Sequence, residues 1–353
     1  MFHPAILVKV VGMQRAVLMD QRQIVIEEVA TPHIGPGEVL VKNKVSTTCG
    51  TDVKNYMRGY PLLKPPHPFG HEFSGVIAAV GDGVTGFVEG DRVAVHNSAP
   101  CGSCHWCKHG QFSMCEDLLF NRGSYAEYVR VPARIVRQNM FKLPDSMSHK
   151  TASLMEPLAC AVYGIENCPI EPGDFVVVNG AGPIGLMFAR LAVLKGAQVL
   201  VTDISQGRLD IAERMGVWGT LNLQRVVDSV GAVRELTDDQ RGADVVIEAT
   251  GLIDVWQTSC QMARKGGFIL LFGGTKAGSA FTVDATLLHY SQLTVKGVFH
   301  TTPLAVKQAF KLLELGVIDE RDFIQNEYCL GDLEAALLEH ASGDVIKNCI
   351  VYE

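Results

Sequence analysis

Four cysteines in one short segment have the spacing of a metal site. Two residues separate the first from the second and the second from the third, and seven separate the last two, in the order Cys101, Cys104, Cys107 and Cys115. Short spacing lets successive thiolates turn toward one centre, and four sulfurs complete a tetrahedral shell around Zn²⁺ with no position for water. The usual ferredoxin spacings of iron–sulfur proteins differ from this one. The segment predicts a closed, structural zinc site in a lobe at about residues 96–118; the alternative is four free thiols.

A second group of residues could hold a catalytic metal. Cys49 opens the sequence Cys-Gly-Thr-Asp, His71 and Glu72 follow about twenty residues later, and Glu156 begins a Glu-Pro-Leu segment. One thiolate, one imidazole and one carboxylate leave a coordination position open, which a catalytic zinc requires. Each residue alone has an ordinary alternative, since a single Cys is usually buried in a core and a single Glu is usually solvated. A nucleotide motif on the same chain favours the metal interpretation.

This motif is a glycine-rich turn between a β-branched run at 175–178 and an apolar helical segment at 186–194. Its sequence is Gly180-Ala181-Gly182-Pro183-Ile184-Gly185. The first glycine permits a tight strand-to-helix turn, the second lets the backbone approach a pyrophosphate, and the third lets helix and strand pack closely. The helix N-terminus then faces the phosphates. The pattern predicts a dinucleotide-binding βαβ unit; the alternative is an ordinary glycine-rich turn.

The acidic residue Asp203 closes the next strand-like run, 198–202, about twenty residues after the turn. A carboxylate at that position binds the adenosine ribose hydroxyls. It would also repel the 2′-phosphate of NADP, so the sequence favours NAD. Arg208, five residues further on, is either a ribose contact or a solvated helix residue.

The composition excludes several classes of partner. The 353 residues carry 31 Lys+Arg and 38 Asp+Glu, for a formal net charge of −7. This acidic charge balance does not indicate a basic surface that would bind nucleic acid or an anionic membrane. Hydrophobic residues make up 47% of the chain, which rules out global disorder. The longest apolar runs are far short of the roughly 20 residues that span a bilayer.

The N-terminus and the cysteines indicate the compartment. The apolar stretch 5–11 is interrupted by Lys9 and lacks a small-residue cleavage site, so it predicts a strand and not a secretory signal. We therefore expect a cytoplasmic protein. In a reducing compartment, the tight cluster among the ten cysteines is better explained by metal than by disulfides.

The elements that position these residues fall into two domains. Strand-like and helix-like runs alternate from about residue 171 to 299, which predicts a doubly wound parallel sheet. Before it, short strands separated by Gly and Pro, such as 76–80 and 92–95, indicate a β-rich domain that carries both metal motifs. No internal repeat or long linker is visible.

The last segment of the chain returns to the first domain in this interpretation. Helical periodicity at 304–315 precedes a strand-like run at 348–352, which cannot easily extend a parallel sheet. We therefore expect the cofactor domain, 166–299, to be inserted between 1–165 and 300–353.

Taken in order, these motifs resemble the medium-chain, zinc-dependent alcohol and polyol dehydrogenases. The similarity covers nearly the whole chain from about Met13, and its motifs are highly specific in combination. They are the Cys-Gly-Thr-Asp at 49–52, the Gly-His-Glu-Phe-Ser-Gly at 70–75, the four-cysteine lobe, the Glu-Pro-Leu at 156–158 and the glycine turn. The Glu-Pro-Leu segment, in place of a zinc-binding cysteine, is similar to the branch that contains sorbitol, threonine and butanediol dehydrogenases.

The resemblance implies an α/β fold with a GroES-like β-rich catalytic domain and an inserted Rossmann domain. It implies a catalytic zinc on Cys49, His71 and one or both of Glu72 and Glu156, with Asp52 as the partner of the His71 ring. It also implies homodimers or homotetramers.

Two features depart from the family pattern. Residues 1–12 precede the point where such proteins usually begin. Five residues after Cys49, where relatives often carry a histidine that passes the proton to solvent, this sequence has Lys54. An ordinary lysine titrates near 10.4 and relays a proton poorly at neutral pH. Thr51 is therefore the better candidate for the first relay step, and Lys54 either binds an anionic substrate group or is a surface lysine.

The predicted activity is oxidation of a secondary alcohol of a polyol, sugar alcohol or diol by NAD, with two zincs per chain. Related alternatives are an L-threonine 3-dehydrogenase and a sugar-phosphate or sugar-acid dehydrogenase. An alternative of another class is a non-catalytic, zinc-stabilised NAD-binding protein. Asp203 disfavours a zinc-free reductase that uses NADPH.

Charge counting predicts how the carboxylates behave. Zn²⁺ with thiolate Cys49, neutral His71 and one carboxylate is formally neutral, and a second carboxylate makes the centre anionic. We therefore expect that Glu72 and Glu156 do not both stay bound when the substrate arrives.

Overall fold

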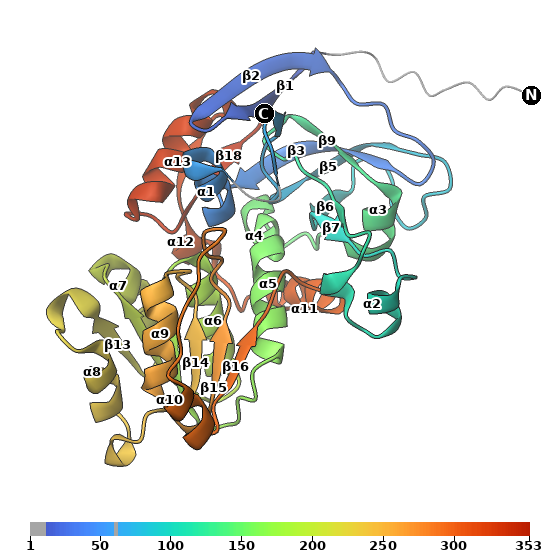
Figure 1. Ribbon diagram of the computed structural model, residues 1–353. Helices are drawn as coiled ribbons and strands as arrows, with labels where there is room; N and C mark the ends of the chain where they lie inside the picture. The colour runs from blue at the N-terminus through green and yellow to red at the C-terminus, as the bar shows by residue number, and fades with distance from the viewer. Residues whose placement is uncertain (1–11, 60–62) are drawn as a thin grey trace, which may run out of the picture. The chain divides into compact units, whose positions relative to one another are not determined.

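The computed structural model describes residues 12–59 and 63–353, and the strand expected at 5–11 lies outside them. The chain divides into two compact units, Met1–Glu156 with Thr302–Glu353, and Pro157–Thr301. Figure 1 labels many of their elements. The sequence placed the inserted segment at 166–299. The second unit begins earlier because helix α5 (Met155–Glu166) packs within it, where Gly164 lies against the rings of Phe188 and Phe272.

The second unit is built on a six-stranded, entirely parallel sheet in the order β13-β12-β11-β14-β15-β16. This is the strand order of a dinucleotide-binding Rossmann fold. Val176, Val177 and Val178 are fully buried, as expected for a central parallel strand. The strands are β11 (Phe175–Asn179), β12 (Gln198–Asp203), β13 (Gly219–Asn222), β14 (Ala243–Glu248), β15 (Ala263–Leu271) and β16 (Thr294–Gly297).

Helices alternate with these strands, so the predicted doubly wound pattern is confirmed. Their apolar side chains, such as Val233 and Met262, join Val177 and Ile269 in one buried core. The helices are α6 (Pro183–Leu194), α7 (Gln206–Arg214), α8 (Ser229–Glu235), α9 (Ile253–Met262) and α10 (Ala285–Tyr290), with short 3₁₀ turns at Leu223–Arg225 and Asp238–Gln240.

The first unit is rich in β-structure. A seven-stranded sheet runs β10-β6-β5-β3-β18-β17 with β9 added on β3, and smaller sheets join β2-β1-β4 and β7-β8. The strands are β1 (Gly12–Asp20), β2 (Gln23–Ala30), β3 (Val39–Thr47), β4 (His67–Pro68), β5 (Phe73–Val80), β6 (Arg92–Val95), β7 (Ser98–Ala99), β8 (Leu119–Phe120), β9 (Tyr128–Val131), β10 (Met140–Lys142), β17 (Ile324–Tyr328) and β18 (Lys347–Val351).

The C-terminal segment returns to this unit, as the sequence predicted. Strand β18 pairs antiparallel with β3, with Cys349 opposite Thr47, so the C-terminal strand lies beside the end of the strand that leads to Cys49. The helices are α1 (Gly50–Arg58), α2 (His105–Lys108), α3 (Ala133–Asn139), α4 (His149–Ser153), α11 (Pro303–Glu314), α12 (Glu320–Phe323) and α13 (Leu333–Ser342), with 3₁₀ turns at Phe112–Met114 and Leu330–Asp332.

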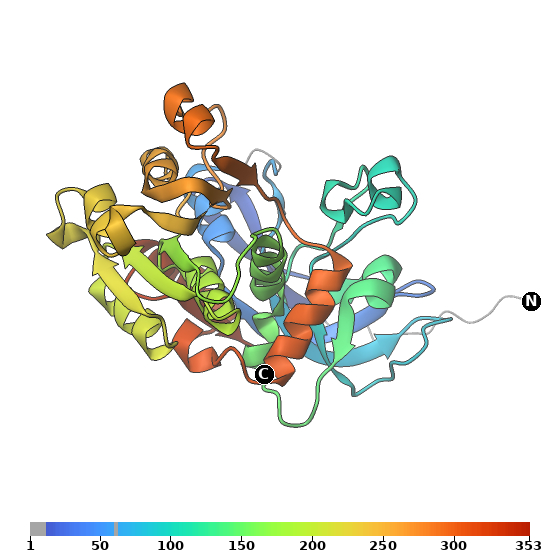
Figure 2. The same cartoon turned by 90° about the horizontal axis from the view of Figure 1, so that it is seen from below.

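Figure 2 shows the four-cysteine lobe, coloured teal around α2, standing out from the strands of the first unit. Among the described residues, no helix has the length and apolar character needed to cross a membrane.

Candidate active site

Three of the predicted catalytic residues meet in the first unit. Cys49, His71 and Glu72 each offer one ligand atom, and these atoms lie within 4.8 Å of one another. Cys49 caps the N-terminus of α1, where its sulfur accepts a hydrogen bond from the Thr51 amide at 3.4 Å. His71 and Glu72 lie between β4 and β5. The Thr47 amide, at the end of β3, donates to the Glu72 carbonyl at 3.2 Å and ties the two segments together.

The imidazole of His71 is oriented by Asp52. The His71 Nδ1 lies 3.0 Å from Oδ1 of Asp52, whose side chain is 5% exposed. Because a carboxylate accepts only, Nδ1 carries the proton and Nε2 is left to bind a metal. Burial opposes a charge on His71, but the Asp52 carboxylate and the Cys49 sulfur outweigh it and hold the pKa of His71 well above its usual range.

Glu72 is completely buried and has a cationic partner that the sequence interpretation missed. The Nζ of Lys347, on β18, lies 2.9 Å from Oε1 and 2.7 Å from Oε2 of Glu72, and the Thr47 hydroxyl donates to Oε2. Burial opposes the lysine charge, but Glu72 outweighs it and raises the pKa of Lys347. The available signal was a lysine at the start of the short C-terminal strand, two positions before the apolar run 349–351.

Glu156 lies at the start of α5 and is 7% exposed. The side-chain amide of Asn97 donates to its Oε1 at 3.0 Å. Burial, aided by the charge of Glu72, raises the pKa of Glu156 to about 7, against the opposing effect of His71 and Lys347. Glu156 is not part of the 4.8 Å group that Cys49, His71 and Glu72 form.

The two remaining predicted residues of this centre lie on α1. Thr51 stands in its first turn and Lys54 in its second, and both are partly buried. The backbone amide of Thr51 lies next to the Cys49 sulfur, to which it donates the hydrogen bond described above.

The four cysteines of the lobe form a second, separate cluster. The sulfurs of Cys101, Cys104, Cys107 and Cys115 lie within 4.8 Å of one another, and all four cysteines are free. Backbone amides point at the sulfurs: Cys101 Sγ accepts from the Ser103 and Cys104 amides at 3.4 and 3.3 Å. The amide and hydroxyl of Ser103 lower the pKa of Cys101 to about 6, which favours the thiolate, the form in which cysteine binds a metal. The donor set fits a closed tetrahedral zinc site.

The glycine turn has the backbone that the motif predicted. Gly180 has φ of +102°, and Gly182 caps α6 with Pro183 and Ile184 in its first turn. A Cβ at Gly185 would lie 1.8 Å from the Gly180 carbonyl oxygen, whereas a Cβ at Gly182 would meet nothing within 4 Å. The third glycine is therefore required for packing, and the second leaves its backbone open to a ligand.

Asp203 ends β12 beside this turn. Its Oδ2 accepts from the Ala181 amide at 2.7 Å, and its Oδ1 accepts from the Ser205 amide at 2.8 Å. The carboxylate is thus fixed at the carboxyl end of the parallel sheet, where nucleotides bind in such folds. Arg208 follows on α7 and is partly buried.

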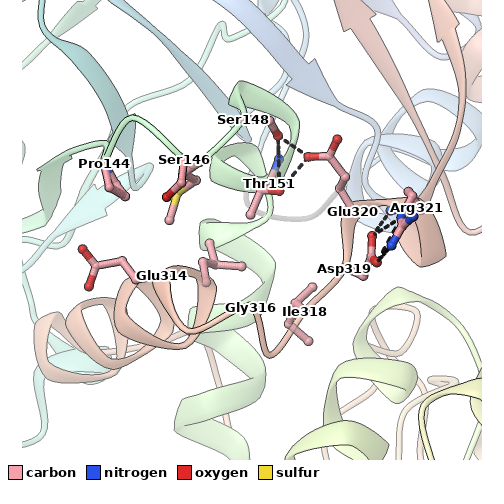
Figure 3. Close-up of a pocket in the computed structure, with 12 residues that line it drawn as sticks. Pro144, Ser146, Ser148, Thr151, Glu314, Gly316, Ile318, Asp319, Glu320 and Arg321 are labelled. Atoms are coloured by element: carbon pink, nitrogen blue, oxygen red, sulfur yellow. Dashed lines mark hydrogen bonds and ion pairs between the residues drawn. The ribbon is translucent and has the colours of Figure 1, made fainter.

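A pocket of about 400 Å³ lies elsewhere in the first unit, between the segment 144–151 and the segment 313–321. Figure 3 shows Glu320 bound to the hydroxyls of Ser148 and Thr151, and Arg321 paired with Asp319. None of the predicted site residues is among the described residues that line it.

Comparisons with known proteins found two matching family models. Residues 35–145 match the family model of the alcohol dehydrogenase GroES-like domain, and residues 183–314 match that of the zinc-binding dehydrogenases.

Individual relatives match the whole chain. Sorbitol dehydrogenase of Bacillus subtilis (strain 168) is 30% identical over 92% of this chain and 93% of its own. A probable D-xylulose reductase A of Neosartorya fischeri is 34% identical over 95% of both. The crystal structure of a putative zinc-binding dehydrogenase from Sinorhizobium meliloti 1021, bound to NADP, has a TM-score of 0.89 at 27% identity and covers 97% of this chain and 100% of that one.

A GroES-like unit with a Rossmann unit and a Cys–His–Glu centre defines a zinc-dependent oxidoreductase that uses a nicotinamide cofactor. The chain belongs to the medium-chain, zinc-dependent alcohol and polyol dehydrogenase family.

Proposed function

We propose that this protein oxidises a secondary alcohol of a polyol, sugar alcohol or diol with NAD, and catalyses the reverse reduction. The observation that carries the proposal is the meeting of Cys49, His71 and Glu72 within 4.8 Å, on a chain that also has the nucleotide-binding turn. The sorbitol dehydrogenase and D-xylulose reductase relatives support a polyhydroxylated substrate.

The residues of the centre have separate roles in this proposal. Cys49 and His71 hold the zinc, and Asp52 keeps the proton on Nδ1 of His71 so that Nε2 stays available. A zinc ion held by these residues would supply Lewis acidity toward the substrate hydroxyl, and a bound nicotinamide cofactor would supply the hydride acceptor. Thr51 relays the hydroxyl proton: its hydroxyl accepts that proton and gives up its own toward solvent. Lys54 lies on the same helix, where relatives often have a histidine, and is a candidate to bind an anionic substrate group.

Lys347 gives a physical basis for the expected exchange of carboxylates. We propose that Glu72 and Glu156 do not both bind the metal when the substrate is present. The ion pair with Lys347 compensates the charge of Glu72 when that carboxylate is away from the metal. A substrate-analogue complex with both carboxylates about 2.0 to 2.2 Å from the zinc, beside the substrate oxygen, would overturn this step.

The choice of NAD rests on Asp203. Its carboxylate is fixed beside the glycine turn, where it can accept from the ribose hydroxyls and repel a 2′-phosphate. Turnover measured with both cofactors tests this, with NADP as the poorer substrate; equal turnover with both would contradict it.

The zinc content separates an enzyme from a zinc-stabilised nucleotide-binding protein. We expect about two zincs per chain, one at the Cys49 centre and one in the lobe, because both donor sets fit zinc. A single zinc per chain would favour the non-catalytic alternative.

A substrate panel is the direct test. Polyols, diols, sugar acids, a sugar phosphate and threonine should be screened for NADH formation, and we expect polyols or diols to react. Cys49→Ser should abolish this turnover and leave the fold intact. Unchanged turnover in this variant would overturn the assignment of the metal centre.

We also propose that the protein is a homodimer or homotetramer in the cytoplasm. β16 ends the order of the parallel sheet, and Tyr290 and Phe299 nearby in sequence are 76% and 44% exposed. Such an edge can pair with a second copy. The thiolate-rich metal sites suit a reducing compartment. Light scattering on a sizing column measures the assembly, and a monomer would contradict it.

A further inference from the structure

The ring of Tyr125 lies against the backbone that carries His71. Gly70 immediately precedes His71 and has φ of +88°, and a Cβ there would lie 2.6 Å from the Cδ2 atom of Tyr125. Both the conformation and the space therefore require glycine at this position. The amide of Tyr125 donates to the carbonyl of Phe69 at 3.0 Å, and the two rings meet edge to face with centroids 5.5 Å apart. Tyr125 thus contacts the segment that leads directly to His71.

The hydroxyl of Tyr125 reaches the same histidine by a second route. It donates to Oδ2 of Asp52 at 2.8 Å, the shorter of its two contacts, with the Thr47 carbonyl at 3.1 Å; Oδ1 of Asp52 faces Nδ1 of His71 at 3.0 Å. The phenol is completely buried and Asp52 is 4% exposed. Each carboxylate oxygen therefore has one fixed partner, and the carboxylate cannot rotate without breaking a buried, charge-assisted hydrogen bond.

We propose that Tyr125 is a positioning residue for the metal centre: its ring fixes Gly70, its hydroxyl fixes Asp52, and together they hold His71 so that Nε2 faces Cys49. This inference rests on the proposed zinc at Cys49 and His71, and it assigns a role to a residue of the Gly-Ser-Tyr-Ala-Glu-Tyr segment that the sequence interpretation did not single out. Burial, with the negative charge of Asp52, raises the pKa of Tyr125 well above its usual range, so the phenol remains a donor.

The test removes the hydroxyl and keeps the ring. Tyr125→Phe retains the contact with Gly70 and leaves Oδ2 of Asp52 without its donor. Tyr352→Phe is the matched control, because the Tyr352 hydroxyl is also in this unit, 3.3 Å from the Ser124 carbonyl and 3.5 Å from the Ser46 hydroxyl, with no contact to Asp52 in the described structure. Urea unfolding checks that both variants are folded.

The readout is metal affinity, measured by competition with a chelator for Zn²⁺ and by the absorption bands of Co²⁺ at the Cys49 site. We expect Tyr125→Phe to lower the Zn²⁺ affinity of the Cys49 site roughly tenfold and to shift its Co²⁺ absorption bands. A tenfold loss is the lower end of the effect that removal of a hydrogen-bond partner of a metal ligand has on metal affinity. The four-cysteine lobe in the same chain serves as the internal reference and should keep its affinity. Tyr352→Phe should change neither site.

A double variant tests whether Tyr125 acts through Asp52. In the Asp52→Asn background, Tyr125→Phe should add little to the loss of metal affinity, because the effects of substitutions within one hydrogen-bond network are not additive. Wild-type affinity in Tyr125→Phe, an equal loss in Tyr352→Phe, or a full further loss in the Asp52→Asn background overturns the proposal. A wild-type chain that binds metal in the lobe alone overturns the Cys49 centre itself, and the wild-type measurement distinguishes the two failures.

Discussion

Lys347 and Glu72 form an ion pair that is closed to solvent, with side chains that are 1% and 0% exposed and with Nζ 2.7 Å from the nearer carboxylate oxygen. The pair joins the C-terminal strand β18 to the segment between β4 and β5, next to the candidate ligands Cys49 and His71. A buried carboxylate without a partner is strongly disfavoured. The lysine therefore compensates the buried charge of Glu72 beside the candidate metal centre.

Replacing Lys347 by Met should destabilise the protein. The substitution leaves the Glu72 charge buried and uncompensated, and removal of one partner from a buried pair costs about 3–5 kcal/mol. Urea unfolding of the metal-free protein measures this free energy.

The matched control for this experiment is the pair of substitutions Lys347→Met and Glu72→Gln together. It removes both charges, so it should recover a large part of the lost stability. A single Lys347→Met variant that is as stable as the wild type would show that the pair has no stabilising role.

The sequence predicted those parts of the molecule that local patterns determine. The run 92–95 is strand β6 as expected, and the glycine turn has its strand, helix and Asp203 in the expected places. Here the required backbone conformation, the packing and the spacing all lie within one short segment, so residue types alone carry the information.

The side chains that contact the candidate metal centre from distant segments could not be found in the same way. Lys347 is 275 positions from Glu72, and Tyr125 is 73 positions from Asp52. These contacts exist because β18 pairs with β3 and because the segment after the lobe packs against Phe69 and Gly70. A single sequence shows that a lysine and a tyrosine are present, but not that they are buried or which carboxylate each one contacts.

The free energy of unfolding should fall in mild acid because of the partly buried imidazole of His149. Burial, with the charges of Arg92 and Lys44, lowers the pKa of His149 to about 4, and its Nδ1 lies 2.8 Å from the Ser74 hydroxyl. Because the folded-state pKa is below the unfolded value of 6.5, the stabilisation is fully present above pH 6.5 and is lost as the pH falls toward 4. The loss should be roughly 1 to 2 kcal/mol, reduced from the full shift because the ring is partly exposed.

Urea unfolding as a function of pH measures this effect. His149→Gln should flatten the curve between these two pH values relative to the wild type. His33 is exposed, so His33→Gln should leave the curve unchanged. Identical pH profiles for the wild type and His149→Gln would contradict the prediction.

Replacing Cys101 by Ser should remove the lobe metal and leave the other. The lobe then has three thiolates in place of four, and a closed site of this kind needs all of its ligands. Elemental analysis should show a fall from about two zincs per chain to about one. Cys260 is buried in α9 outside both clusters, so Cys260→Ser should keep the full zinc content. Two retained zincs in Cys101→Ser would count against the lobe site.

Replacement of the second or the third glycine of the turn by Ala should affect different properties of the protein: NAD affinity at Gly182 and stability at Gly185. A Cβ at Gly182 meets nothing within 4 Å, so Gly182→Ala should cost less than about 1 kcal/mol of stability, the amount typical for Ala at a helix cap. Its new methyl group occupies the side from which the pyrophosphate approaches, so NAD affinity should fall by about tenfold or more. A Cβ at Gly185 lies 1.8 Å from the Gly180 oxygen, so Gly185→Ala should destabilise the fold by about 1–3 kcal/mol or more.

Calorimetric NAD titration and urea unfolding, applied to both variants, separate the two effects. Gly207→Ala, on α7 with open space around the added Cβ, should change neither NAD affinity nor the packing of the turn. If Gly182→Ala bound NAD as tightly as the wild type, the backbone of this turn would not lie against the pyrophosphate, and the nucleotide assignment would lose its central contact. If Gly185→Ala were as stable as the wild type, the close approach of α6 to the Gly180 carbonyl would not be required by the fold. The two glycines therefore test binding and packing independently, because of these two positions only Gly185 has protein atoms within 4 Å of an added Cβ.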